Sequence, residues 1–257
     1  MLAYEVAGQG PPILLLHAFP LSHAMWKDQI APLAQLGRVI APDLPGLGRS
    51  ARQVNPSIAD MAAAIAGVLD ALTVQEPVVV AGLSMGGYVA FELWRQFPSR
   101  VRALGLFSTR AGADTPEQRA GRQRLAEQVR REGVEPVIQT IMPKLLGKAT
   151  LASQPMVVEA VQWLILANKP NGVADALLAM EARQDSTPLL PSISVPTLLL
   201  AGDEDTIVSS EDWEAMKQAI PHAKLERLDK AGHLLNLEQP AEFLGAFRRF
   251  LKDVLPR

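Results

Sequence analysis

Short apolar runs alternate with stretches of helical periodicity along most of the chain, and this alternation constrains the fold more than any other feature. Strands separated by helices in this way are typical of βαβ units, which build a parallel sheet covered by helices on both faces. We therefore expect a doubly wound α/β fold with a mostly parallel sheet of about seven strands. The predicted strands are Leu2–Val6, Ile13–His17, Val39–Pro42, Val78–Gly82, Val101–Phe107, Thr197–Ala201 and Leu225–Leu228, and the predicted helices lie near 22–36, 57–73, 85–97, 209–219 and 240–253.

Residues 112–188 break the alternation, because they contain only helical patterns and no strand-like run. The segment Thr115-Pro116-Glu117-Gln118 resembles a capping box with proline at the first helical position, which marks the start of a helix. A helical insertion between two strands of an α/β sheet is most simply a lid. We expect residues 1–111 and 189–257 to form the α/β core and residues 112–188 to form a helical lid inserted before the last two strands.

Composition excludes several functional classes. A chain of 257 residues can bury one sizeable core, and its net charge of −2 offers no basic surface to nucleic acid. It has no cysteine, which excludes disulfides, thiolate metal sites and a cysteine nucleophile. The first residues show no signal-peptide pattern, and no apolar run approaches the ~18 residues that a membrane span needs. We expect a cytoplasmic protein without membrane or nucleic-acid partners.

A single serine flanked by glycines follows one of the predicted strands. The strand Val78–Gly82 is followed by Ser84, Gly86 and Gly87, and a helical pattern resumes at once. One explanation is structural: serine is a common helix N-cap, and glycine is common in turns. Glycines two positions before and two after the serine are what a tight strand-to-helix turn requires, since side chains there would keep strand and helix apart. The pattern predicts Ser84 as a nucleophile.

The partners of such a serine are expected at the carboxyl ends of other strands, where open α/β sheets place their function. His233 follows the predicted strand Leu225–Leu228, whereas His222 precedes it and falls at the opposite edge. Asp205 follows the strand Thr197–Ala201. The order serine, acid, histidine along the chain is the one expected with this type of turn. We expect Ser84, Asp205 and His233 to form a catalytic triad.

An oxyanion hole is expected in the loop after the strand Ile13–His17, which reads Ala18-Phe19-Pro20. We expect the backbone N–H groups of Phe19 and Met85 to converge on one carbonyl oxygen. Loss of one such donor costs ~3–4 kcal/mol in the transition state, so this loop matters nearly as much as the triad.

Together these motifs resemble the α/β-hydrolase fold superfamily, and in particular its small capped serine esterases and β-ketoadipate enol-lactone hydrolases. The resemblance implies that Ser84 is the nucleophile, Asp205 the acid and His233 the base. The chain departs from the family at Ala18, where glycine is usual, and it lacks the first of the usual eight strands. The motifs that carry the resemblance are His17-Ala18-Phe19-Pro20, Asp43-Leu44-Pro45-Gly46-Leu47-Gly48-Arg49-Ser50, Gly82-Leu83-Ser84-Met85-Gly86-Gly87, Gly202-Asp203-Glu204-Asp205 and Ala231-Gly232-His233.

Two other interpretations of the motifs are weaker. The stretch 46–51 fits a dinucleotide-binding pattern, but Pro56 and Ser57 place the next helix too late for one, and no suitable acidic residue ends a following strand. His17 and His23 are six residues apart across a loop with proline, a spacing without logic for a metal pair. Structural roles are expected for both histidines, and neither metal nor cofactor is expected.

The predicted function is a serine hydrolase that cleaves carboxylic esters of small neutral acyl groups through an acyl-enzyme. One alternative is a lactone hydrolase like 3-oxoadipate enol-lactonase, with Arg110 pairing a substrate carboxylate and Arg183 behind it. Another is a non-catalytic small-ligand receptor on the same fold. A dehalogenase is disfavoured, because it needs a carboxylate in place of Ser84. We expect a monomer or homodimer acting on a small ester or lactone, with substrate contacts from Arg110, Met142, Trp163, Val208 and Leu234, and further lid candidates Leu146 and Met180.

Overall fold

The structure, a computed structural model, describes residues 2–256 of the chain. Within them lies a seven-stranded sheet in the order β1-β3-β2-β4-β5-β6-β7. β1 pairs antiparallel with β3, and all other neighbouring strands are parallel. This confirms the predicted mostly parallel sheet. The strands are β1 Tyr4–Ala7, β2 Pro12–Leu16, β3 Arg38–Pro42, β4 Val78–Leu83, β5 Val101–Phe107, β6 Thr197–Gly202 and β7 Ala223–Leu228.

Burial explains why the sequences of the central strands are continuous apolar runs. Every residue of β2, β4 and β6 is buried, as expected for parallel strands covered on both faces. The edge strands are mostly exposed or half-buried, with Leu228 of β7 as the one buried residue of β1 and β7, and their sequences are correspondingly more polar. The chain order reverses between β2 and β4, so the crevice at their carboxyl ends is where a site is expected.

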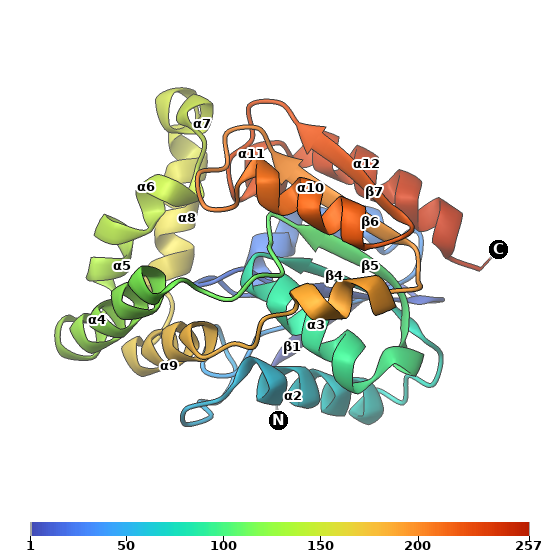
Figure 1. Ribbon diagram of the computed structural model, residues 1–257, viewed down its shortest axis with the longest axis horizontal. Coiled ribbons are helices and arrows are strands. Elements are labelled where there is room, and N and C mark those ends of the chain that lie inside the picture. The colour runs from blue at the N-terminus through green and yellow to red at the C-terminus, as the bar shows by residue number, and fades with distance from the viewer. Residues whose placement is uncertain (1, 257) are drawn as a thin grey trace.

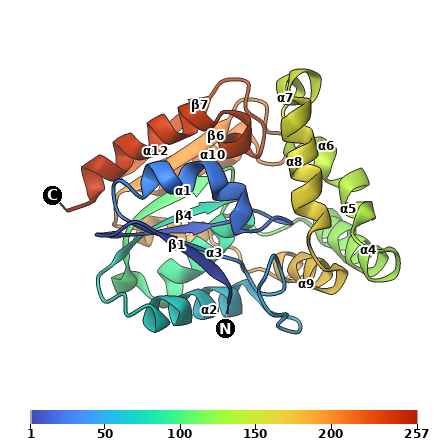
Figure 2. The ribbon, with the colours of Figure 1, turned by 180° about the vertical axis from the view of Figure 1, so that it is seen from behind.

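Helices cover both faces of the sheet (Figures 1 and 2). α2, α3 and α10 lie on one face, and α1 and α12 lie on the other. Phe107 of β5 meets Phe243 and Phe247 of α12 with ring centroids 5.1 and 5.2 Å apart, which fastens the last helix to the middle of the sheet. The core helices are η1 His23–Trp26, α1 Lys27–Leu33, α2 Ile58–Ala71, α3 Met85–Gln96, η2 Pro98–Arg100, η3 Thr187–Ser192, α10 Ser210–Ala219, α11 Leu235–Glu238 and α12 Pro240–Val254.

The segment between β5 and β6 is helical and stands apart at one end of the sheet, on the left in Figure 1. Its first helix begins as predicted: the Thr115 hydroxyl accepts from the Gln118 N–H, and the Gln118 side chain accepts from the Thr115 N–H. We call its part from α4 to α9 the lid; the division of lid from core at residues 112 and 188 stays a prediction. The lid helices are α4 Pro116–Glu132, α5 Glu135–Thr140, α6 Met142–Leu145, α7 Lys148–Ser153, α8 Pro155–Leu166 and α9 Pro170–Glu181.

Polar contacts anchor the lid to the loops that follow β2 and β3. The Asn168 side chain accepts from the Gly48 N–H at 2.7 Å and donates to the Pro20 carbonyl at 2.7 Å. The Arg52 guanidinium pairs with the buried Asp175 carboxylate of α9 at 2.6 Å. None of the helices within residues 2–256 has both the length and the apolar character needed to cross a membrane.

Candidate active site

Ser84 sits on a strained turn between β4 and α3. Its φ of +54° and ψ of −112° lie where side-chain-bearing residues are rare, and its hydroxyl makes no helix-cap hydrogen bond. A Cβ on Gly82 would overlap the backbone of Gly86, and one on Gly86 would overlap the carbonyl of Leu16. The flanking glycines are therefore required by the close approach of strand and helix, and the turn presents the hydroxyl instead of using it as a cap.

Asp205 and His233, from the loops after β6 and β7, form a buried pair. The His233 Nδ1 donates to Asp205 Oδ2 at 2.8 Å, and the two side chains are 2% and 0% exposed. Asp205 Oδ1 accepts from the N–H groups of Ile207 at 2.8 Å and Val208 at 3.2 Å. Burial by itself would raise the pKa of Asp205, but His233 and these N–H groups outweigh it and lower the pKa. The carboxylate is thus ionised and orients the imidazole.

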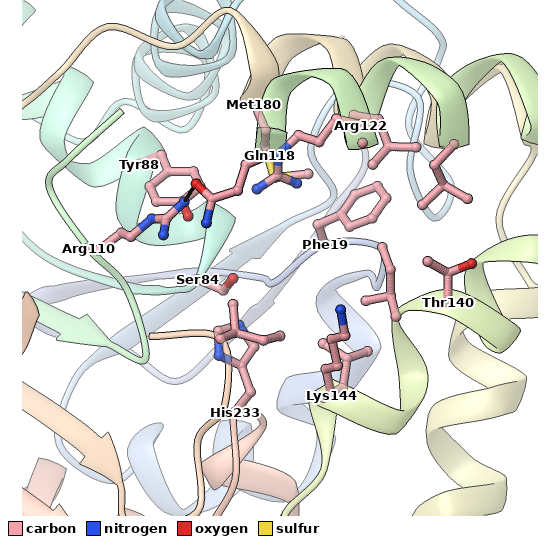
Figure 3. Close-up of a pocket in the computed structure, with 16 residues that line it drawn as sticks. Phe19, Ser84, Tyr88, Arg110, Gln118, Arg122, Thr140, Lys144, Met180 and His233 are labelled. Carbon is pink, nitrogen blue, oxygen red and sulfur yellow. Dashed lines mark hydrogen bonds between the residues drawn. The ribbon is translucent and has the colours of Figure 1, made fainter. Parts of the chain in front are cut away.

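Ser84 and His233 lie on the wall of one cavity of about 250 Å³ between the sheet and the lid (Figure 3). In the close-up the Ser84 side chain lies directly above the His233 ring. The structure therefore brings together the serine and the histidine, and through the histidine the aspartate, from three separate loops. The cavity is lined by Phe19, Ser84, Tyr88, Arg110, Gln118, Gly121, Arg122, Leu125, Thr140, Ile141, Lys144, Leu145, Leu177, Met180, Ile207 and His233.

Of the two residues expected to supply an oxyanion hole, one lines the cavity and the other directly follows Ser84. Phe19 lines it, and Met85 is the first residue of α3, directly after Ser84. Within residues 2–256, neither backbone N–H donates to an acceptor of the chain. Both N–H groups are therefore without an acceptor in the described chain, as the donors of an oxyanion hole must be.

His17 and His23 have the structural roles expected of them. Burial lowers the pKa of His17 to about 4, so its ring is neutral. It accepts from the Leu44 N–H at 2.9 Å through Nε2 and donates to the Ala18 carbonyl at 2.9 Å through Nδ1, which shapes the loop before Phe19. Ala18 is not among the residues with positive φ in the described chain, so alanine replaces glycine there without strain. His23 binds the buried Asp43 at 2.7 Å.

Arg110 lines the cavity, as predicted, but its guanidinium is already bonded. It pairs with the buried Asp114 carboxylate at 2.7 Å and donates to the Gln118 side chain at 2.8 Å. Arg122 and Arg183 bind the same carboxylate, and Arg183 also lies 4.2 Å from the centre of the Tyr88 ring. Burial would raise the pKa of Asp114, but these arginines, Arg122 first, lower it. Three guanidinium groups thus share one carboxylate beside the cavity.

Two lid residues predicted to contact substrate lie elsewhere. Trp163 of α8 is 72% exposed and points away from the lid interior, because it is two positions from the fully buried Val161 and Ile165 on the opposite side of the helix. Met142 of α6 is buried but does not line the cavity. In that helical stretch Ile141, Lys144 and Leu145 share the inward face, and Met142 falls beside it.

Val208 and Leu234 are likewise not among the lining residues, although both neighbour residues that are. Their side chains are 1% and 0% exposed and belong to the core. Their backbone N–H groups act instead: Val208 donates to Asp205, and Leu234 donates to Glu238 Oε1 at 3.1 Å. Of the further candidates, Met180 lines the cavity, whereas Leu146 and Arg183 do not.

The cavity also contains cations that sequence reasoning did not identify. Arg122 comes from α4, where Gln118, Gly121, Arg122 and Leu125 recur at helical spacing on one face, a signal that was present in the sequence. Lys144 carried no such signal; Figure 3 shows its amino group directed into the cavity. Among residues 2–256, no group of three or more His, Cys, Asp or Glu side chains is arranged to hold a metal ion.

Comparison with known proteins agrees with this geometry. A sequence model of the alpha/beta hydrolase fold matches residues 11–240. The chain is 30% identical to 3-oxoadipate enol-lactonase 1 of Acinetobacter baylyi, over 98% of this chain and 94% of that protein. Among solved structures, it is similar to a malate-bound thermophilic esterase from Thermogutta terrifontis, with 42% identity, a TM-score of 0.96 and coverage of 99% and 94% of the two chains.

A second solved structure, the enol-lactonase from Burkholderia xenovorans, has 26% identity, a TM-score of 0.90 and coverage of 98% and 96%. The parallel sheet, the serine on a strained strand-to-helix turn and the helical segment over the strand ends define the class of fold. The chain belongs to the α/β-hydrolase fold family.

Proposed function

We propose that the protein is a serine hydrolase that cleaves carboxylic esters through an acyl-enzyme. The observation that carries this proposal is the His233–Asp205 pair on the wall that also holds Ser84. Because a carboxylate accepts, the proton of the neutral imidazole is on Nδ1, and the lone pair of Nε2 is free to take a proton from the Ser84 hydroxyl. Similarity to a thermophilic esterase at 42% identity supports the same reaction class.

The reaction then has two steps. The Ser84 oxygen attacks the ester carbonyl while His233 takes its proton, and the negative oxygen that forms is stabilised by the N–H groups of Phe19 and Met85. His233 returns the proton to the leaving alcohol. Water attacks the acyl-enzyme by the same route, with His233 as base, and releases the acid and the free serine. Asp205 holds the imidazole and stabilises its protonated form.

The apolar side chains of the cavity support small neutral acyl groups as one substrate class. Phe19, Leu125, Ile141, Leu177 and Met180 offer an apolar surface. In a cavity of about 250 Å³, such surface suits a short acyl chain.

A second candidate, a lactone hydrolase acting on an acidic substrate, is favoured by the charges of the cavity. The lining residues of the described chain include Arg110, Arg122 and Lys144 but no aspartate or glutamate. Lys144 forms no ion pair within residues 2–256. A substrate carboxylate would supply the missing negative charge. The similarity to two enol-lactonases supports this candidate.

Hydrolysis of p-nitrophenyl acetate and hexanoate tests the proposed reaction. Ser84→Ala should lower kcat by at least about 10⁴-fold while the protein stays folded, and Ser153→Ala, which changes an exposed lid serine, should match the wild type. A serine-directed phosphonate should add its mass only to the peptide that contains Ser84. Full activity in Ser84→Ala would overturn the proposal. Slow turnover of every substrate with strong stabilisation by a ligand would favour the receptor alternative instead.

Parallel measurement of acidic lactones and their neutral methyl esters separates the two substrate classes. The cytoplasmic location and the monomeric or homodimeric state stay predictions.

A further inference from the structure

Two carboxylates hold one short segment of the lid against the loops that carry the triad. Glu238 of α11 accepts from the Gly147 N–H at 2.7 Å, and Glu204, next to Asp205 in the chain, accepts from the Ala149 N–H at 2.8 Å. Gly147 and Ala149 lie at the start of α7, directly after the residues of α6 that line the cavity. The lid therefore meets the catalytic loops at this point through its backbone.

Glu238 also bonds the loop of His233. Its Oε1 accepts from the Leu234 N–H at 3.1 Å, while its Oε2 accepts from Gly147. The Leu234 N–H in addition lies 3.1 Å from the carbonyl of Leu145, a residue that lines the cavity. The Glu238 side chain thus joins Leu234, which follows His233, to Gly147, which lies two positions after the cavity residue Leu145.

The lid segment and the His233 loop are packed backbone against backbone. A Cβ on Gly232 would overlap the Gly147 backbone, so the two backbones are in direct contact next to His233. The two segments therefore cannot move closer together.

Burying the Glu238 carboxylate costs free energy that packing alone would not require. The side chain is 2% exposed, and no positive side chain within residues 2–256 compensates its charge. Burial raises the pKa of Glu238, and the N–H groups around it, Gly147 first, only partly offset that rise. An apolar residue would fill the volume at lower cost, but it could not accept two N–H groups from two different segments.

We propose that Glu238 is a positioning residue that locks the lid segment 145–149 to the His233 loop, so that the base and the lid wall of the cavity keep a fixed separation. The part that concerns His233 rests on the proposed function. Glutamate is suited to this task because its two oxygens accept independently, one from each segment. Glu204, whose side chain bonds only the lid, supports the lid side of the lock.

Glu238→Gln tests the lock with little change of shape. An amide keeps one accepting oxygen, so either Gly147 loses its acceptor or Leu234 keeps only its bond to the Leu145 carbonyl. We expect kcat to fall by about tenfold and KM to rise severalfold, because base and wall both shift. Amide hydrogen exchange followed by NMR should accelerate at Gly147 and, to a smaller extent, at Leu234, which still donates to the Leu145 carbonyl. Glu242→Gln, an exposed glutamate in α12, is the matched control and should leave all three quantities unchanged.

A second variant separates the two sides of the lock. Glu204→Ala frees the Ala149 N–H but leaves Leu234 bonded to Glu238, so we expect KM to rise with kcat within about twofold of the wild type. If Glu238→Gln is folded and has wild-type kcat, KM and amide exchange, the proposal is wrong. The proposal is also wrong if the loss of kcat disappears when wild type and Glu238→Gln are each measured at the same interval below their own Tm. That result would indicate a purely structural role.

Folding failure and failure of the proposed function are both informative. If Glu238→Gln does not fold, Glu238→Asp is the second variant, since it keeps the charge but shortens the side chain by one methylene. We expect the same changes in kcat, KM and amide exchange. If neither variant folds, Glu238 is structural and the proposal is overturned. Should the wild type show no Ser84-dependent hydrolysis, the proposed function fails, whereas the exchange rates at Gly147 and Leu234 still decide whether the lock exists.

Discussion

The sheet side and the lid side of the cavity hold their polar groups in opposite ways. On the sheet side, Asp205 is fully bonded by His233 and two backbone N–H groups, and each contact comes from a short loop at a strand end. On the lid side, the lining residues of the described chain include Arg122 and Lys144 but no carboxylate, and Lys144 extends from a single helical turn into the cavity. The sheet side is thus complete before a substrate arrives, whereas the lid side lacks an anion.

This difference indicates a division of labour between the two walls. Preorganised groups accelerate a reaction because they need no rearrangement in the transition state, and they tolerate little displacement. Charged groups on a partly exposed wall are screened by water, so each contributes modestly to the choice of substrate. Changes on the sheet side should therefore alter activity much more than changes on the lid side.

The largest effect is expected at Asp205, the proposed acid of the triad. Asp205→Asn keeps the shape of the side chain, but its amide no longer fixes the proton of the imidazole on Nδ1. We expect kcat to fall by about 10³- to 10⁴-fold with little change in KM for a p-nitrophenyl ester. A fall of less than tenfold would mean that another group orients His233.

The effect of Asp205→Asn on the free energy of unfolding should depend on pH. The pKa of Asp205 is lowered in the folded protein, so its ionised form stabilises the fold above the ordinary pKa of aspartate, and this contribution is lost as the pH falls through the folded pKa. The difference in free energy of unfolding between wild type and Asp205→Asn should be largest near neutral pH and shrink below about pH 4. Urea unfolding at several pH values measures it; a constant difference would contradict the assignment.

The next effect concerns the turn that holds the serine. A side chain on Gly86 would meet the Leu16 carbonyl, so Gly86→Val should displace the Met85 N–H and lower kcat by about a hundredfold or more. Met85→Leu changes only a buried side chain and should keep most of the activity. Equal kcat in the two variants would show that the turn tolerates displacement.

On the lid side, a smaller and selective effect is expected. Lys144→Met removes the cation without an ion pair and should lower kcat/KM for an acidic lactone by about fivefold to tenfold, as for a partly exposed ion pair. The neutral methyl ester of the same substrate should be unaffected. Lys169→Met, an exposed lid lysine outside the cavity, is the control. Equal losses for both substrates would remove the support for an acidic substrate.

The smallest effect is expected at Trp163. Since its side chain is directed outward, Trp163→Ala should change kcat/KM by less than about twofold for any substrate that the wild type hydrolyses. A larger change would mean that α8 turns toward the cavity during turnover.

The strands and the turn around Ser84 were predictable because their signals are local. A strand covered on both faces must be apolar throughout, and glycines flanking the serine are needed wherever strand and helix meet so closely. Asp205 and His233 followed from the rule that parallel strands bring their carboxyl ends to one edge. The lid contacts were not predictable in this way, since Trp163 and Lys144 both stand in amphipathic helices of unspecified orientation.

The amino-acid sequence by itself determined the parallel sheet, the strained turn and the three residues expected to form the triad, because periodicity, turn chemistry and chain order act over short distances. Only the tertiary structure decided which lid residues face the cavity, that three arginines share Asp114, and that Glu238 joins the lid to the His233 loop. These depend on how whole helices pack against the core, and a rotation of one helix by a single residue exchanges the side chains that face the cavity.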